Sequence, residues 1–131
     1  MRILLDTSYL YNLIDAPGSL SAAERLVLSS PDITLFVSAV SIWEMRLKHA
    51  ARHRTGARKN ALDPQAVIAL LEDQNVTFLP MTVAHAAARL ETSLKHKDPF
   101  DELLLLQAQA EGLRLMTVDR QLKKHPLAIA P

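Results

Sequence analysis

The chain has 131 residues, 49% of them hydrophobic, and a formal net charge of +1, which fits one domain spanning residues 1–131 with a sizeable core. It contains no cysteine, so disulfides and thiolate metal sites are excluded and a reducing, cytoplasmic setting is expected. No apolar run approaches the roughly 20 residues needed to cross a membrane, and Asp6 interrupts the first run too early for a signal peptide.

Short apolar runs alternate with helical periodicities along the chain. The run Ile3–Leu5 predicts a strand buried on both faces, and similar runs predict strands at 33–37, 76–80 and 113–118, with a short fifth at 127–129. Capping residues and proline or glycine breaks predict helices at 7–14, 21–28, 38–53, 65–73, 82–94 and 98–111. This alternation predicts a three-layer α/β/α sandwich around a parallel sheet of four to five strands.

Acidic residues recur where these elements meet. Asp6 ends the first strand, Glu44 lies early in the helix after the second strand, and Asp119 directly follows the fourth strand. Asp98 and Asp101 open the buried helix before that fourth strand. Because the carboxyl ends of parallel strands share one edge, where open parallel sheets bind ligands, we expect these side chains to meet there.

Mutual repulsion indicates what such a cluster would do. Two carboxylates ~4 Å apart repel by about 4 kcal/mol at an effective dielectric near 20, so several in one pocket must bind protons or a cation. Oxygen ligands without Cys or His favour a hard ion, Mg²⁺ or Mn²⁺. Such a site suits phosphodiester hydrolysis by a metal-activated water, with no covalent nucleophile.

Each acid also has a purely structural interpretation. Ser41 and Glu44 have the spacing of a capping box. Asp98 fits the cap of the following helix, which is its preferred role, and Asp119 could begin a turn. Asp6 has the least structural reason to be charged, because an unpaired charge at the end of a buried strand is costly.

A basic interval without any acidic residue separates Glu44 from Asp63. Taken alone it is more often a solvated helix face, but beside an anionic metal site it would suit a polyanionic substrate. Trp43 lies on an apolar helical stripe and is expected in the core, and the five histidines show no metal-ligand spacing. The cations of the interval are Arg46, Lys48, Arg52, Arg54, Arg58 and Lys59.

Four motifs in this order resemble the PIN-domain ribonucleases of the VapC toxin type. They are Leu4-Leu5-Asp6-Thr7-Ser8, Ser38-x-x-Ser41-x-Trp43-Glu44, His96-Lys97-Asp98-Pro99-Phe100-Asp101-Glu102 with the leucines and glutamines that follow, and Leu115-Met116-Thr117-Val118-Asp119. The resemblance covers essentially the whole chain. It implies an Mg²⁺- or Mn²⁺-dependent endoribonuclease that inhibits translation by cutting RNA.

The resemblance also implies a homodimer and a cognate antitoxin, which often binds DNA, docked near Tyr9, Leu10, Leu13 and Trp43. It implies that Thr117 orients water or a carboxylate and that Asp98 is an extra acid near the site. Glu102 stands where this branch often has arginine, so one positive substrate contact is lost. The acidic quartet that the resemblance implies is Asp6, Glu44, Asp101 and Asp119.

Two other functions fit parts of this evidence. A phosphoacceptor receiver domain also binds Mg²⁺ through acids at strand ends, but it would want an aspartate after its third strand, where this chain has Leu79-Pro80. A PIN fold that binds RNA without cutting it would leave the complete acidic set unused.

Overall fold

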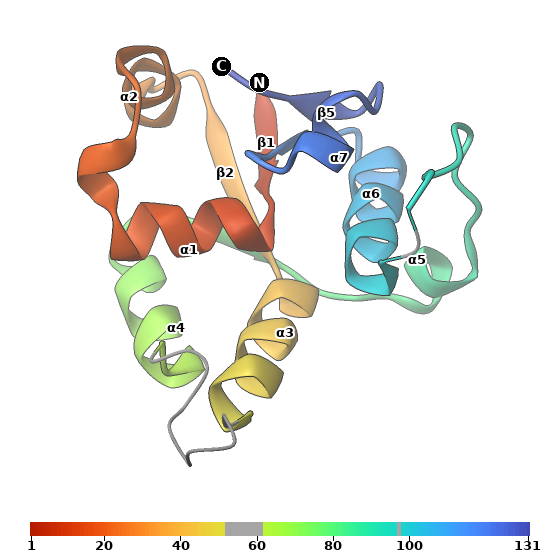
Figure 1. Ribbon diagram of the computed structural model, residues 1–131, viewed down its shortest axis with the longest axis horizontal. Helices are drawn as coiled ribbons and strands as arrows, with labels where there is room; N and C mark the ends of the chain where they lie inside the picture. The colour runs from red at the N-terminus through yellow and green to blue at the C-terminus, as the bar shows by residue number, and fades with distance from the viewer. Residues whose placement is uncertain (52–61, 97) are drawn as a thin grey trace.

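The computed structural model describes residues 1–51, 62–96 and 98–131, and these form a parallel sheet with helices on both faces (Figure 1). The strands are β1 (Arg2–Leu5), β2 (Thr34–Ser38), β3 (Thr77–Leu79), β4 (Arg114–Met116) and β5 (Ala128–Ile129). The helices are α1 (Thr7–Asp15), the 3-10 turn η1 (Pro17–Ser19), α2 (Ala22–Ser29), α3 (Ala39–Ala50), α4 (Pro64–Glu72), α5 (Val83–Ala87), α6 (Pro99–Glu111) and α7 (Arg120–Lys123).

The sheet has the order β3-β2-β1-β4-β5, and every neighbouring pair is parallel. The order reverses between β1 and β4, which is where open α/β sheets form their ligand crevice. Receiver domains have the order 2-1-3-4-5 instead, so the receiver interpretation is excluded by topology. The predicted parallel sheet of the three-layer α/β/α class is confirmed.

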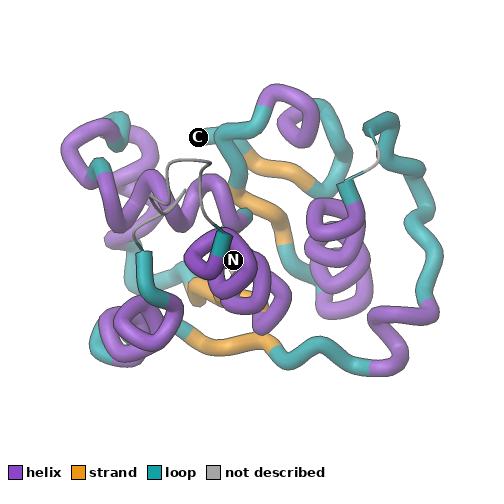
Figure 2. The backbone as a smooth tube through the Cα atoms, turned by 60° about the horizontal axis from the view of Figure 1, so that its bottom comes forward, coloured by secondary structure: helices purple, strands orange, loops and turns teal. Residues whose placement is uncertain are grey.

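Two apolar clusters hold the helical layers against the two faces of the sheet. On one face, Leu4 and Leu115 pack against Leu104 and Leu105 of α6. On the other face, Ile3, Leu5 and Met116 pack against α1, α3 and α4. Figure 2 shows the row of strands between these two groups of helices. The unbroken apolar character of β1 follows from this arrangement, since successive residues point to opposite faces and both faces are covered.

The predicted helix boundaries hold where capping residues set them. Ser21, Asp63 and Asp98 each accept a backbone N–H at the start of α2, α4 and α6, and Pro64 and Pro99 begin the last two. Gly112 ends α6 in the left-handed conformation at φ 68°, which only glycine adopts without strain. Among the described residues, no helix has the length and apolar character to span a bilayer.

One predicted helix is much shorter than expected. The chain starts a helix after Thr82, but α5 ends at Ala87 and residues 88–94 are not helical. Side chains of other elements take the backbone groups that a helix would have used: Gln109 bonds the N–H of Glu91 and the carbonyl of Arg89 at 2.9 Å each. His125 likewise binds the carbonyl of Thr92 at 2.8 Å. Tertiary hydrogen bonds therefore override the local helical preference here.

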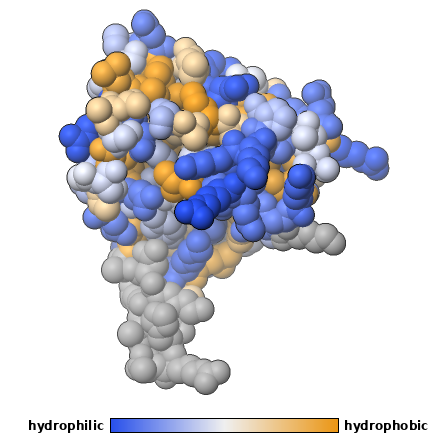
Figure 3. All heavy atoms as spheres, turned by 45° about the horizontal axis from the view of Figure 1, so that its top comes forward, coloured by the Kyte–Doolittle hydropathy of each residue, from blue (hydrophilic) through white to orange (hydrophobic). Residues whose placement is uncertain are grey.

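Trp43 is not in the core, contrary to the sequence prediction. It is 52% exposed and Leu47 is 41% exposed, whereas Ser41, Glu44 and Met45 face inward on α3. Large apolar side chains also reach the surface elsewhere, and Figure 3 shows orange patches among the hydrophilic residues of one face. Isolated exposed apolar residues are ordinary. It is unusual, however, for a helix to bury a serine and a glutamate while it exposes a tryptophan. This orientation indicates that the buried polar face of α3 has a function.

Candidate active site

Asp6 lies at the point where the strand order reverses. It follows β1, its backbone N–H bonds the carbonyl of Met116 in β4 at 3.0 Å, and its side chain is 1% exposed. One carboxylate oxygen accepts the N–H of Ser8 at 3.3 Å, so Asp6 is also the N-cap of α1. From the sequence, Asp6 had the least structural reason of these acids to be charged, and the helix cap supplies one.

The environment of Asp6 nevertheless disfavours its charge. Burial raises the pKa of its carboxyl from 3.8 to about 6, and the charges of Asp101 and Asp119 add to the rise. Hydrogen bonds from the Thr117 hydroxyl and the Ser8 N–H act in the opposite direction but do not overcome burial. A helix cap does not require a carboxylate to be buried among other carboxylates. Capping therefore does not explain why Asp6 lies in this environment.

Thr117 and Asp119 come from the loop after β4. The Thr117 hydroxyl is buried, donates to the second Asp6 oxygen at 2.5 Å and accepts the N–H of Asp119 at 3.0 Å. Asp119 in turn caps α7, a short helix that the sequence analysis missed, by accepting the N–H of Gln121 at 2.8 Å. Thr117 therefore fixes the distance between the loops that follow β1 and β4.

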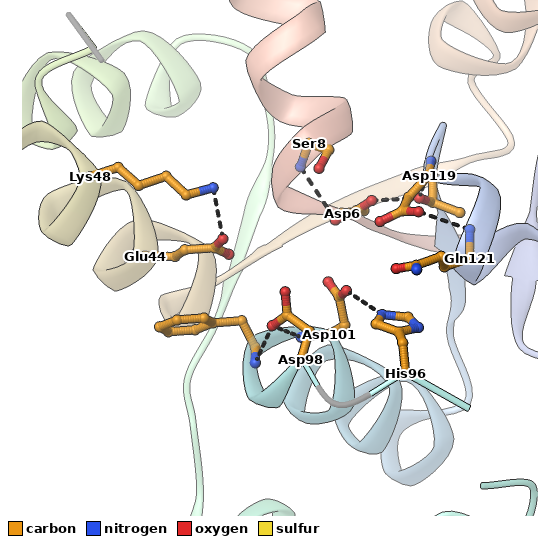
Figure 4. Close-up of polar contacts among 11 residues, drawn as sticks. Asp6, Ser8, Glu44, Lys48, His96, Asp98, Asp101, Asp119 and Gln121 are labelled. Atoms are coloured by element: carbon orange, nitrogen blue, oxygen red, sulfur yellow. Dashed lines mark hydrogen bonds and ion pairs between the residues drawn. The ribbon is translucent and has the colours of Figure 1, made fainter. Parts of the chain in front are cut away.

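Asp101 approaches the same space from α6, in the helix's first turn (Figure 4). Burial raises the pKa of its carboxyl, and the charges of Asp98 and Asp119 contribute to the rise. His96 opposes it, because its Nε2 lies 2.8 Å from an Asp101 oxygen. No histidine was predicted in this cluster. The spacing of five residues between His96 and Asp101, across the start of a helix, could have indicated that the two side chains meet.

Asp98 is a helix cap, as preferred from the sequence. One of its oxygens accepts the N–H of Phe100 at 2.9 Å and that of Asp101 at 3.3 Å. Figure 4 shows its carboxyl group beside that of Asp101, facing the same space. It therefore adds negative charge to the site while holding the start of α6.

Glu44 lies on the other side of this space (Figure 4) and is not part of a capping box. Ser38, not Ser41, is the N-cap of α3, so Glu44 falls in the second turn, only 9% exposed. Ser41 instead accepts the Thr7 hydroxyl at 2.8 Å, which joins the start of α1 to α3. Glu44 pairs with Lys48 at 3.0 Å, and the Lys48 ammonium also lies 5.4 Å from the Tyr11 ring centre.

The donor set of this edge suits a hard divalent cation. Its acids come from four separate segments and offer carboxylate oxygens as ligands. Two of them, Asp6 and Asp101, have raised pKa values that a bound cation would lower. Within the described ranges, no three His, Asp or Glu side chains are grouped closely enough to hold a metal ion as they stand. The residues therefore fit the ion in their chemistry, and binding it would require their side chains to move closer together.

Only part of the predicted basic interval lies within the described residues. Arg52, Arg54, Arg58 and Lys59 lie outside the described residues. Lys48 is paired with Glu44, and Arg46 lines a separate hollow of about 540 Å³ between α3, α4 and β3. The described part of the interval thus presents no row of cations along the acidic edge.

The docking region implied for a partner is also revised. Tyr9 is 1% exposed, with its hydroxyl bonded to Glu24 at 2.7 Å, and Leu10 is fully buried, so neither can line a groove. Trp43 does line a hollow, but that hollow is bounded by α4 and β3 rather than by α1. Its ring also meets Phe100 of α6 edge to face, with centres 5.8 Å apart.

Comparisons with known proteins agree with this architecture. The family model described as PIN domain matches residues 3–126. Twelve chains of solved structures match significantly. One of them belongs to the crystal structure of VapBC2 from Rickettsia felis, bound to a DNA fragment from the promoter of these proteins. That chain has 18% sequence identity and a TM-score of 0.69, over 98% of this chain and 96% of its own. No curated protein sequence matches significantly.

Proposed function

Because the chain belongs to the PIN-domain family, we propose that it is a metal-dependent endoribonuclease that cuts RNA phosphodiester bonds with a water nucleophile. The observation that carries the proposal is the buried junction between β1 and β4. There Asp6 is held next to Asp101 and Asp119 with its charge disfavoured and no lysine or arginine bonded to it among the described residues. A divalent cation would remove that cost.

In this proposal Asp6, Glu44, Asp101 and Asp119 hold Mg²⁺ or Mn²⁺, with Asp98 near enough to contribute through water. The bound cation would supply the positive charge that stabilises the phosphate and the leaving oxygen during hydrolysis. Thr117 and Ser8 orient the two oxygens of Asp6, and His96 orients Asp101. Positioning partners of this kind commonly change metal affinity or activity by 10–100-fold when removed.

We further propose that the enzyme is the VapC-type toxin of a toxin–antitoxin pair, which inhibits translation when released from its antitoxin. The likeness in fold to VapBC2 and the four ordered motifs support this assignment. A cognate antitoxin and a second copy of the chain, as a homodimer, are the partners that the assignment implies. The exposed Trp43, Leu47 and Phe78 give a partner apolar surface to cover.

The non-catalytic alternative, a PIN fold that only binds RNA, is disfavoured by the same junction. A binding surface gains nothing from an aspartate whose pKa is raised by burial and, to a smaller extent, by neighbouring carboxylates. Those carboxylates would also repel phosphate. If the protein only binds RNA, removing the acids should strengthen RNA binding, and neither the wild type nor the variants should cleave RNA.

The test is RNA cleavage by the purified, partner-free protein with Mg²⁺, with Mn²⁺ and with EDTA. Cleavage should require a divalent ion and should be abolished by Asp6→Asn, which keeps the helix cap. The matched control is Asp63→Asn, the same change at the cap of α4, where Asp63 accepts the N–H of Gln65 at 3.0 Å. If Asp6→Asn cuts RNA as fast as the wild type, or EDTA has no effect, the proposal is wrong.

A further inference from the structure

A second hollow lies beside the acidic edge, between the segment that precedes α6 and the helix α7. Its volume is about 490 Å³, within the roughly 300–1,000 Å³ of small-ligand sites. We call it the α7 hollow, and it is lined by Thr92, Ser93, Leu94, Lys95, His96, Arg120, Gln121, Lys124, His125 and Pro126.

A buried histidine fixes the two walls of the α7 hollow. His125 is 8% exposed, its Nε2 lies 2.8 Å from the carbonyl of Thr92, and its Nδ1 accepts the N–H of Leu127 at 3.2 Å. A ring with its proton on Nε2 satisfies both contacts. The ring therefore ties the segment after α5 to the turn after α7. The hollow therefore owes its shape to hydrogen bonds inside the protein.

The charge of the hollow is of one sign. Lys95, Arg120 and Lys124 are exposed on its walls, and none of its lining residues is acidic. The ion pairs found in the described part of the chain involve other cations. Three exposed cations on one surface attract a polyanion, and they lie next to an edge where carboxylates would otherwise repel it.

The hollow shares two walls with the acidic edge. His96 lines it and contacts Asp101, while Arg120 and Gln121 directly follow Asp119 in the chain, with the Gln121 N–H bonded to the Asp119 side chain. Figure 4 shows His96 and Gln121 on the same side of the acids, away from Glu44 and Lys48. An RNA chain that left the acids on this side would enter the α7 hollow.

We infer that the α7 hollow holds the RNA strand next to the scissile phosphate, as a single strand, with Lys95, Arg120 and Lys124 contacting its backbone. The inference rests on the proposed nuclease function and adds the direction in which the substrate runs. Leu94 and Pro126 give the hollow apolar lining on which a ribose or base can lie. A positively charged groove that follows the backbone is a usual means of holding single-stranded nucleic acid.

The test compares the double variant Arg120→Gln/Lys124→Gln with Lys123→Gln, all in the chain carrying Asp6→Asn so that RNA is not cut. Lys123 is an exposed lysine of the same helix that does not line the hollow. The probe is a fluorescent single-stranded oligoribonucleotide, measured by anisotropy over a range of salt concentrations. In the cutting protein the same substitutions are measured for KM and kcat.

We expect the double variant to bind RNA roughly ten-fold more weakly and to lower the slope of log K against log salt by about 1.4, because two single-strand phosphate contacts are lost. In the cutting protein KM should rise with little change in kcat, and Lys123→Gln should match its parent in both assays. Equal binding and equal KM for the double variant and Lys123→Gln would overturn the inference while leaving the nuclease proposal intact.

Two further outcomes separate the inference from the proposal it rests on. RNA binding that depends on Arg120 and Lys124 in a protein that never cuts RNA would support the hollow and overturn the nuclease proposal. Polyglutamate that competes as well as the RNA, with the same dependence on the two cations, would overturn the inference, because the hollow would then be a general polyanion patch.

Discussion

The two ends of the acidic edge carry carboxylates in opposite electrostatic conditions. At the inner end, Asp6 is buried between β1 and β4 with carboxylates as its charged neighbours, and its pKa is raised to about 6. At the outer end, Glu44 is almost as buried but has the ammonium of Lys48 at 3.0 Å. Burial is therefore common to both, and the presence of a counter-charge is what differs.

This difference indicates which end depends on a ligand. A buried carboxylate with its own lysine is already compensated, and it can remain charged without any other partner. A buried carboxylate facing other carboxylates is compensated only by a proton or by a bound cation. We therefore expect loss of the inner acids to affect metal binding and catalysis more than loss of Glu44.

The largest expected effect is on catalysis at the inner end. Asp119→Asn keeps the cap of α7, since asparagine caps as well as aspartate. It should nevertheless lower kcat by more than about 100-fold, because the proposed function makes Asp119 a direct metal ligand. Glu44→Gln should lower kcat less, by about ten-fold. Single-turnover cleavage under saturating Mn²⁺ measures both. Equal losses for the two variants would contradict the difference between the ends.

The next largest effect is on the pH dependence of stability without metal. The folded-state pKa of Asp6 is raised from 3.8 to about 6, so the folded protein holds that proton more tightly than the unfolded chain. The associated stability is present below about pH 4 and is lost as the pH rises through about 6, by about 3 kcal/mol. The raised pKa of Asp101 acts in the same direction.

Urea unfolding in EDTA between pH 4 and pH 7 measures this change. Asp6→Asn should remove most of it and should make the metal-free protein more stable than the wild type at pH 7. The opposite result is a wild type whose stability rises from pH 4 to pH 7, with Asp6→Asn following the same curve. It would show that the charge of Asp6 is already compensated in the metal-free protein.

A smaller effect is expected at Thr117. Thr117→Val keeps the buried shape but removes the hydrogen bond to Asp6 and the acceptor for the Asp119 N–H. We expect about a ten-fold lower kcat and about 1–2 kcal/mol lower stability. Thr117→Ser restores the hydroxyl and should recover most of the activity. Equal kcat for the valine and serine variants would assign Thr117 a packing role only.

The smallest effect is expected at the outer end. Lys48→Met frees Glu44 from its counter-charge, and a pair of this exposure is worth up to about 1 kcal/mol, so Mn²⁺ affinity should rise up to about five-fold. Lys123→Met, an exposed lysine distant from Glu44 in the chain, is the control. A fall in affinity after Lys48→Met would mean that Lys48 positions Glu44 for the metal instead of competing with it.

The sequence was sufficient for the features that depend on local chemistry. Apolar runs gave the strands, and caps such as Asp63 and Asp98 gave the helix starts within a few residues. The meeting of Asp6 and Asp119 followed from parallel-sheet topology, and the start of the helix that carries Asp101 could be placed at the same edge. Their roles in metal binding and catalysis stay predictions.

Features set by distant partners could not be obtained in the same way. The early end of α5 depends on Gln109 and His125, which lie about 20 and 30 residues further along the chain. The exposure of Trp43 depends on Ser41 being bonded to Thr7 across the site, which turns the polar face of α3 inward. The α7 hollow depends on a helix of four residues, too short to show a periodicity.

The most direct test of the account is calorimetric titration of Mn²⁺ into the wild type and Asp6→Asn at pH 6, in buffers of different ionisation enthalpy. Near its pKa of about 6, Asp6 is partly protonated, so binding to the wild type should saturate and release protons. Asp6→Asn should bind at least about 100-fold more weakly and release fewer protons. Mn²⁺ binding of equal affinity and equal proton release in the two proteins would contradict the account.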